Sequence, residues 1–238
     1  MQQNVKINTM QWRTKISSDI QFTGYQPKED IKPEVEPKQE LEISNEEYDS
    51  LTLNQKADYI SNYLHQNTEF NDVQIAGIIA CLINESALKR DAENQMEAKK
   101  WADEPHKSGK GIAQWSLGRN LNFAKWMQSN YGEELFPNEA TINQQLEFML
   151  YEMSQRDAFL HALSMATTPE EAADAMRRGF ENGSSNSLAS RKQMDAYIRV
   201  GSPGADDIYK KDAKQANWVY SRLNTILMAK KGIKLLLK

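Results

Sequence analysis

The side chain best placed for acid–base chemistry is Glu85, which closes the most apolar stretch of the chain. Residues 72–85 read DVQIAGIIACLINE, and a helix that is apolar nearly all round is expected at the centre of a core. Ile78, Leu82 and Glu85 follow one another at spacings of four and three, so they share one face of that helix. We expect partial burial to raise the pKa of Glu85, which suits a general acid working near neutral pH. The alternative is that Glu85 only marks the polar end of the helix, with its carboxylate in water.

A second group of residues suited to ligand binding lies at 109–119, where the sequence reads GKGIAQWSLGR. Glycines such as Gly111 let the backbone approach a ligand closely. Gln114 and Trp115 supply an amide and a flat ring that suit a sugar. The spacing lacks the G-x-x-x-x-G-K-[ST] pattern of a phosphate-binding loop. The same residues would also fit a glycine-flanked turn around a buried tryptophan, with no ligand involved.

Helices must position these two groups. Apolar residues at spacings of four and three predict a helix over 53–66, and Asn71 or Asp72 can cap the helix that follows. Thr141 with Gln144 forms a capping-box pattern, and the sequence Thr-Pro-Glu-Glu from Thr168 is a strong helix start. The expected helices are 53–66, 72–85, 119–130, 141–154, 168–180, 187–200 and 213–230.

The stretch 86–118 interrupts the helical pattern. It is dense in charge, lacks sustained periodicity, and contains Pro105, Gly109, Gly111 and Gly118, which favour turns. We expect a loop with at most a short hairpin. The predicted fold class is therefore mainly α, with one irregular or β-hairpin segment between a buried helix and the rest of the domain.

Composition limits the classes of function. The 238 residues can hold one domain of about 150 to 200 residues with appendages. A net charge of −4 gives no global electrostatic reason to bind nucleic acid. The single cysteine, Cys81, excludes an intramolecular disulfide and a cysteine-cluster zinc site, and the three histidines form no local ligand pair. No metal or other cofactor is expected. No stretch matches a membrane span or a secretion signal, so we expect synthesis in the cytoplasm.

The two ends of the chain differ from its middle. Residues 1–50 hold 6 Lys+Arg against 10 Asp+Glu, so the whole net charge falls there. We interpret 1–44 as a disordered or extended acidic arm, which is either a linker or a docking arm. We expect 206–238 to form a C-terminal helix and a basic tail, which is either a solvated end or a peptide that docks on a partner. The main domain would then cover 45–205.

Four segments occur in the order IAGIIACLINESAL, GKGIAQWSLGRN, QQLEFMLYEM and EEAADAMRRGFENGS. Together, over roughly 53–200, they resemble the phage tail lysozyme family, part of the wider lysozyme-like superfamily. In that family a glutamate ends a buried helix, a G-x-G-[IL]-x-Q-W-like segment follows across the cleft, and a later F-E element precedes a final helix. The matching positions here are Glu85, Gly109 to Trp115, and Phe180 with Glu181. The loop between the first two motifs departs from the pattern, because it is more charged than usual.

The resemblance implies a lysozyme-like muramidase, which cleaves the β-1,4 glycosidic bond of peptidoglycan while Glu85 protonates the leaving oxygen. A carboxylate or a positioned water must also act at the oxocarbenium-like centre. Asp103 is our choice, since a short hairpin would bring it across the cleft; the alternative is a solvated loop acid. The other acids of this loop that could serve are Glu93, Glu97 and Glu104.

We expect substrate contacts from both sides of the cleft. The resemblance puts Gly111, Gln114 and Trp115 opposite Glu85. Trp101 either stacks on a sugar ring or fills a small core of its own loop.

Two other functions stay compatible with the sequence. A structural or ejected virion protein could keep the fold without turnover, because a fold does not fix function. A lytic transglycosylase would use the same glutamate but form an anhydro sugar. In each case we expect a component of the phage tail or of its ejected cargo, made in the host cytoplasm and acting at the host cell wall. Its expected partners are peptidoglycan and other virion proteins, the latter bound through the arm and the tail. An endolysin released at lysis is the alternative, and the long acidic arm favours the virion.

Overall fold

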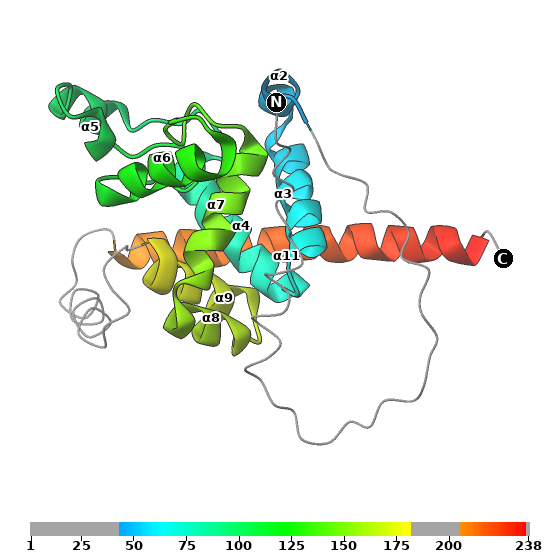
Figure 1. Ribbon diagram of the computed structural model, residues 1–238. Coiled ribbons are helices and arrows are strands. Elements are labelled where there is room, and N and C mark those ends of the chain that lie inside the picture. Colours follow the sequence, from blue (N-terminus) through cyan, green and yellow to red (C-terminus); the bar gives the residue numbers. More distant parts are fainter. Residues whose placement is uncertain (1–42, 182–204, 237–238) are drawn as a thin grey trace, which may run out of the picture. The chain divides into compact units, whose positions relative to one another are not determined.

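The protein is built from helices. The computed structural model describes residues 43–181 and 205–236, and it includes no β-sheet over those two ranges (Figure 1). This confirms the predicted mainly α fold class. The elements are α2 (Asn45–Ser50), α3 (Leu53–Asn67), α4 (Asp72–Ser86), α5 (Gln95–Lys100), the 3-10 turn η1 (Pro105–Lys107), α6 (Gly118–Tyr131), α7 (Ile142–Ser154), α8 (Asp157–Ser164), α9 (Pro169–Met176), the π-helical turn η2 (Arg177–Glu181) and α11 (Ala205–Leu236).

Helix α4 forms the centre of the core, as its composition predicts. Every residue from Ile75 to Ile83 is buried. Asn71 caps its start, and Gln74 completes the capping box. Gly77 lets α9 approach closely, because a Cβ atom there would lie 2.5 Å from the backbone of Ala172. The apolar stretch therefore becomes the element on which α3, α9 and α11 pack.

Helix α11 shares this core. It packs against α4 and α9 (Figure 1, orange to red) and buries Ala216, Val219 and Leu223. Arg222 pairs with Asp58 of α3. α11, predicted as a segment separate from the main domain 45–205, therefore packs on helices of that domain. Residues 1–42 of the predicted arm, the predicted helix 187–200 and the last two residues of the tail lie outside the described residues.

Three short helices were not predicted: α2, α5 and α8 have only six to eight residues each. A segment of that length spans about two turns, too few to show a helical period in the sequence. The expected hairpin is reduced to two isolated bridges, Glu93 with Lys110 and Lys110 with Trp115. The helix expected over 168–180 ends at Met176, and a π-helical turn follows it.

None of the helices in the described parts of the chain is long and apolar enough to cross a membrane.

Candidate functional site

Glu85 lies in the last turn of α4, at the edge of the core, with 23% of its side chain exposed. The chain turns sharply after it, since Ala87 and Leu88 both adopt positive φ angles of 53° and 58°. Left-handed backbone is unfavourable for such residues unless the surroundings hold it. Here the hydroxyl of Tyr48 in α2 donates to the carbonyl of Leu88 at 2.9 Å. The short helix α2 thus supports the turn that follows Glu85.

Glu85 and Gln114 line the same open pocket, which has a volume of about 530 Å³. The Ser86 hydroxyl links the two segments by donating to the carbonyl of Ile112 at 2.8 Å. The described residues around the pocket are mostly polar: Glu85, Ser86, Lys89, Asp91, Ala92, Glu93, Asn94 and Gln114. The structure therefore brings together the helix-end glutamate and the glutamine of the second motif.

Arg177 of η2 contacts the Glu85 carboxylate at Oε1. Its Nε and Nη2 donate to the two oxygens of Asp212 on α11, at 2.7 and 3.0 Å. The Asp212 side chain is 1% exposed, and such bidentate pairs are geometrically strict. One arginine thus joins a buried carboxylate to a carboxylate at the pocket.

Glu181, at the end of η2, is the second glutamate near Glu85. Its Oε1 is buried and has no hydrogen-bond partner among the described residues. Burial, reinforced by the negative charge of Glu85, raises the pKa of Glu181 to about 8, against the opposing effect of Arg119 and Arg177. Burial therefore favours the protonated form of Glu181. π-helical turns of this kind are frequent at functional sites.

Gly111 shapes the second motif from inside the protein. It is buried with φ of +71°, and a Cβ atom would lie 2.6 Å from Oε1 of Gln145. The same Gln145 oxygen accepts from the backbone N–H of Ile112 at 2.9 Å. Gln114 also has positive φ, and its Nε2 donates to the carbonyl of Gly111 at 3.1 Å. Gly111 is therefore required by the turn, and Gln114 is the residue of the motif that reaches the pocket.

Trp115 does not face the pocket as expected. It is fully buried, and its ring packs 5.7 Å from the rings of Phe123 and Phe148. Its Nε1 donates to Glu152 at 3.0 Å. A ring enclosed by aromatic side chains of α6 and α7 leaves no face for a sugar, so Trp115 has a packing role.

Trp101 contacts two lysines through its ring. The ammonium groups of Lys100 and Lys107 are 4.7 and 4.6 Å from its ring centroids, which is cation–π distance. Trp101 is partly buried and does not belong to the described lining of the pocket. Its position favours a role within its own loop over stacking on a sugar.

Asp103 is also not among the described residues that line the pocket with Glu85. It is exposed in the turn after α5. The hairpin that would have carried it across the cleft is not formed, because α5 and η1 occupy this part of the loop. Glu93 is the acid of this loop that lines the pocket together with Glu85.

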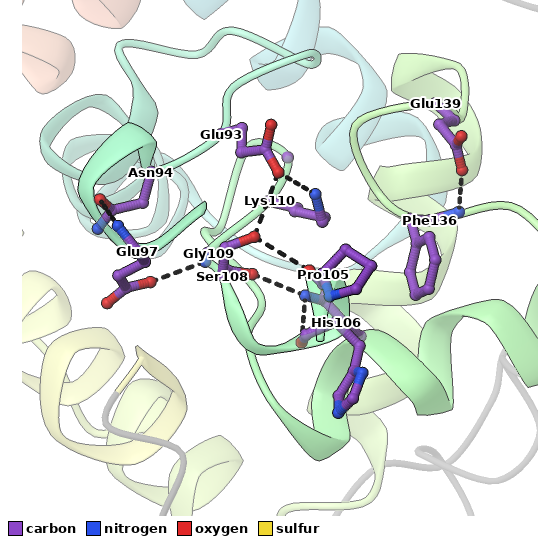
Figure 2. A network of polar contacts seen from close by, with 12 residues as sticks. Glu93, Asn94, Glu97, Pro105, His106, Ser108, Gly109, Lys110, Phe136 and Glu139 are labelled. Atoms are coloured by element: carbon purple, nitrogen blue, oxygen red, sulfur yellow. Dashed lines mark hydrogen bonds and ion pairs between the residues drawn. The ribbon is translucent and has the colours of Figure 1, made fainter. Parts of the chain in front are cut away.

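Glu93 is held in place by its neighbours, as Figure 2 shows. Its Oε1 accepts from Ser108 Oγ at 3.2 Å and is contacted by Nζ of Lys110, which is 6% exposed. Glu97 contacts the same segment of the loop, because it accepts from the backbone N–H of Gly109 at 2.9 Å. Glu93 and Glu97 are thus both held by partners within the loop.

A second arginine–carboxylate cluster lies between α6, α7 and η2. Glu152 accepts from Arg119 at 2.7 and 2.6 Å, from Arg156 at 2.9 Å and from Trp115. Although burial opposes ionisation, these bonds, led by those from Arg119, keep the pKa of Glu152 below its usual value. The guanidinium groups of Arg119 and Arg156 both lie 4.8 Å from the centroid of the Phe180 ring.

The sequence does not predict a role for Arg177 or Asp212, and Glu181 is predicted only as part of the Phe180-Glu181 motif. The one available signal was a charged pair, Arg177 and Arg178, directly after the buried face of α9. Nothing in the local sequence distinguishes the buried arginine from the one paired with Asp174 at the surface. Among the described residues, no group of three His, Cys, Asp or Glu side chains is arranged to hold a metal ion.

Comparison with known proteins gives one family. The family model for phage tail lysozyme matches residues 55–198. That span contains Glu85, the pocket segment and η2, whereas α11 follows it. No curated protein matches the chain.

Proposed function

The chain belongs to the phage tail lysozyme family, and on that premise we propose that it cleaves the β-1,4 glycan bond of peptidoglycan with Glu85 as general acid. The observation that carries this proposal is the position of Glu85, which ends the buried helix α4 and lines an open polar pocket together with Gln114. A general acid must come within hydrogen-bond reach of the leaving oxygen. A carboxyl at the end of a buried helix and open to a pocket can come within that reach of a bound glycan.

The pocket supports a carbohydrate substrate. Its volume of about 530 Å³ falls in the range of small-molecule sites, about 300–1,000 Å³. Its lining offers carboxylates, amides, a hydroxyl and an ammonium group, which match the hydroxyl and amide groups of an amino sugar as hydrogen-bond partners. Gln114 is the proposed binding residue of the second motif.

A second carboxylate completes the proposed reaction. We assign this role to Glu93 in place of Asp103, because Glu93 lines the pocket and Asp103 does not. Lys110 and Ser108 hold one oxygen of Glu93. A carboxylate fixed in this way can stabilise an oxocarbenium-like centre or orient the attacking water.

The test compares purified wild type with Glu85→Gln in a turbidity assay on purified peptidoglycan. The amide keeps the shape and cannot donate the proton, so the rate should fall by about 10²–10⁴-fold. Glu104→Gln is the matched control, since Glu104 pairs with Lys107 on the exposed side of the loop and should keep wild-type activity. Equal, non-zero rates for wild type and Glu85→Gln would remove Glu85 from the mechanism.

Mass spectrometry of the released muropeptides identifies the reaction. Hydrolysis gives reducing sugar ends, and this result supports the proposal. Anhydro sugar ends would instead identify the protein as a lytic transglycosylase and contradict the hydrolase proposal. A folded wild type that releases no fragment from any wall type would point to a structural virion protein instead.

We also place the protein in the phage particle, with its action at the host cell wall. The family's description as a phage tail lysozyme supports this location. Immunoblotting of purified virions is the direct test: detection in the particle supports the proposal, and presence only in the lysate favours an endolysin. The proposed partners are peptidoglycan and other virion proteins.

A further inference from the structure

We propose that α11 belongs to the catalytic unit and that Asp212 on this helix is a positioning residue, which orients Glu85 through Arg177. The inference rests on the proposed role of Glu85 as the acid. It adds a residue beyond 55–198, the span that defines the family match.

Asp212 fixes the plane of the Arg177 guanidinium. Two nitrogens of Arg177 donate to the two oxygens of Asp212, at 2.7 and 3.0 Å. A bidentate pair of this kind allows one orientation of both groups. The third nitrogen, Nη1, contacts Oε1 of Glu85. The orientation of Glu85 therefore depends on a carboxylate of α11.

Asp212 also holds the last turn of α4 directly. Nδ2 of Asn84, the residue before Glu85, donates to Oδ1 of Asp212 at 2.7 Å. Two independent contacts thus connect Asp212 to the end of α4, one through the Asn84 side chain and one through Arg177. Since Asp212 is 1% exposed, its charge is shielded from water and acts on these partners.

The arrangement leaves one oxygen of Glu85 for the substrate. Arg177 contacts Oε1, and no hydrogen bond to Oε2 joins Glu85 to another described residue. A proton donor must point at the glycosidic oxygen, and a displacement of about 1 Å from productive geometry can reduce a rate by about 10²-fold. A residue that holds Oε1 therefore controls where Oε2 can deliver its proton.

α11 has other anchors, so Asp212 can be altered without removing the helix. Ala216, Val219 and Leu223 are buried against the core. Arg222 makes a bidentate pair with Asp58 of α3. The Asp58–Arg222 pair resembles the Asp212–Arg177 pair in chemistry and in linking α11 to the domain, but it does not involve Glu85. Asp58→Asn is therefore the matched control for Asp212→Asn.

The experiment measures kcat and KM on soluble glycan fragments for full-length wild type, Asp212→Asn and Asp58→Asn, each verified as folded by circular dichroism. We expect Asp212→Asn to lower kcat by about 10²-fold with KM within about twofold, because orientation of the acid acts in the transition state. Asp58→Asn should keep the kcat of wild type. Wild-type kcat in folded Asp212→Asn overturns the proposal, as does an equal loss in both variants.

A double-mutant cycle separates positioning from a general structural effect. In a Glu85→Gln background, Asp212→Asn should cause no further loss of the residual rate, since the residue that it positions no longer donates a proton. A further loss of the same size as in wild type contradicts the proposal. If Asp212→Asn does not fold, Arg177→Lys replaces it, because lysine keeps the charge and loses the bidentate geometry.

The outcome also distinguishes this inference from the proposed function. Loss of activity in Glu85→Gln together with wild-type kcat in Asp212→Asn overturns only the role of Asp212. Full activity in Glu85→Gln overturns both the proposed function and the positioning role of Asp212.

Discussion

The protein contains two arginine–carboxylate clusters, one centred on Arg177 and one on Glu152, which use the same groups in opposite proportions. In the Glu152 cluster, one carboxylate receives hydrogen bonds from two arginines and one tryptophan. Both Glu152 oxygens accept two bonds each: Oε1 from Arg119 and Arg156, Oε2 from Arg119 and Trp115. This cluster is closed, since its carboxylate has no acceptor site left for a ligand.

The Arg177 cluster reverses the ratio, with one arginine between two carboxylates. Asp212 is buried, whereas Glu85 lines the pocket. The Arg177 cluster thus has two carboxyl groups for one guanidinium, and the Glu152 cluster has one carboxyl group for two guanidiniums. An excess of carboxylate over arginine leaves acceptor capacity on the member that faces the solvent.

The comparison indicates that the ratio of arginines to carboxyl groups distinguishes a cluster that stabilises the fold from one that can take part in chemistry. A closed, buried cluster stabilises the fold, because removing one partner leaves buried charges without compensation. An open cluster holds a reactive group in place at a pocket. Glu181 lies within the field of both clusters, since the charges of Glu85, Arg119, Arg177 and Glu152 all act on it.

The largest effect on stability is expected at Glu152. Glu152→Gln removes the charge that compensates Arg119 and Arg156, so the free energy of unfolding should fall by about 3–5 kcal/mol. The activity per folded molecule should stay within a few-fold of wild type. Denaturant unfolding and turbidity assays on the same samples measure both quantities. A variant with normal stability and a large loss of kcat would reverse the roles of the two clusters.

The next largest effect is expected at Glu181, which should make the stability of the fold depend on pH. The pKa of this carboxyl is raised from 4.5 to about 8. Between these two pH values the folded state therefore binds more protons than the unfolded state. Stability must therefore fall as the pH rises through this window. At pH 8 and above, Glu181→Gln should be more stable than wild type by up to a few kcal/mol. Near pH 4 the two proteins should be closer in stability.

Denaturant unfolding of wild type and Glu181→Gln between pH 4 and pH 9 provides this measurement. Parallel curves for the two proteins would show that Glu181 titrates normally. Glu133→Gln controls for the loss of a surface carboxylate, since Glu133 is exposed in the segment after α6.

A smaller effect, on rate alone, is expected at Gln114. Gln114→Ala removes an amide from the pocket, and the loss of one substrate hydrogen bond should lower kcat/KM by about tenfold. The free energy of unfolding should change by less than about 1 kcal/mol, because the side chain is partly exposed. Gln128→Ala, at an exposed position of α6, is the control. Unchanged kcat/KM in folded Gln114→Ala would remove this residue from the substrate site.

The smallest effect is expected at Asp103. Asp103→Asn should leave kcat/KM within about twofold, since exposed positions away from a site contribute little. Glu93→Gln should lower it by at least about tenfold if Glu93 acts at the oxocarbenium-like centre. The same turbidity assay compares the two variants. A larger loss in Asp103→Asn than in Glu93→Gln would support Asp103 as the second carboxylate, as the sequence predicts.

Local sequence patterns determined much of this fold. The capping boxes at Thr141 with Gln144 and at Thr168 with Glu171 are formed as predicted, and the apolar run 72–85 became the buried centre. Such features depend on neighbours within one or two helical turns, so the sequence alone contains the information. The order of motifs also identified the family and drew attention to Glu85 and Gln114.

Tertiary structure alone decided which side chains meet. Arg177 contacts a glutamate 92 residues before it and an aspartate 35 residues after it, and no local pattern distinguishes it from Arg178. Trp115 was assigned to the pocket but is buried, because a tryptophan ring suits an aromatic core and a sugar site equally well. The sequence predicts a C-terminal helix, but only its packing on α4 shows that α11 brings Asp212 to the end of the buried helix. Contacts between distant residues depend on how helices pack, which the spacing of residues within one helix does not specify.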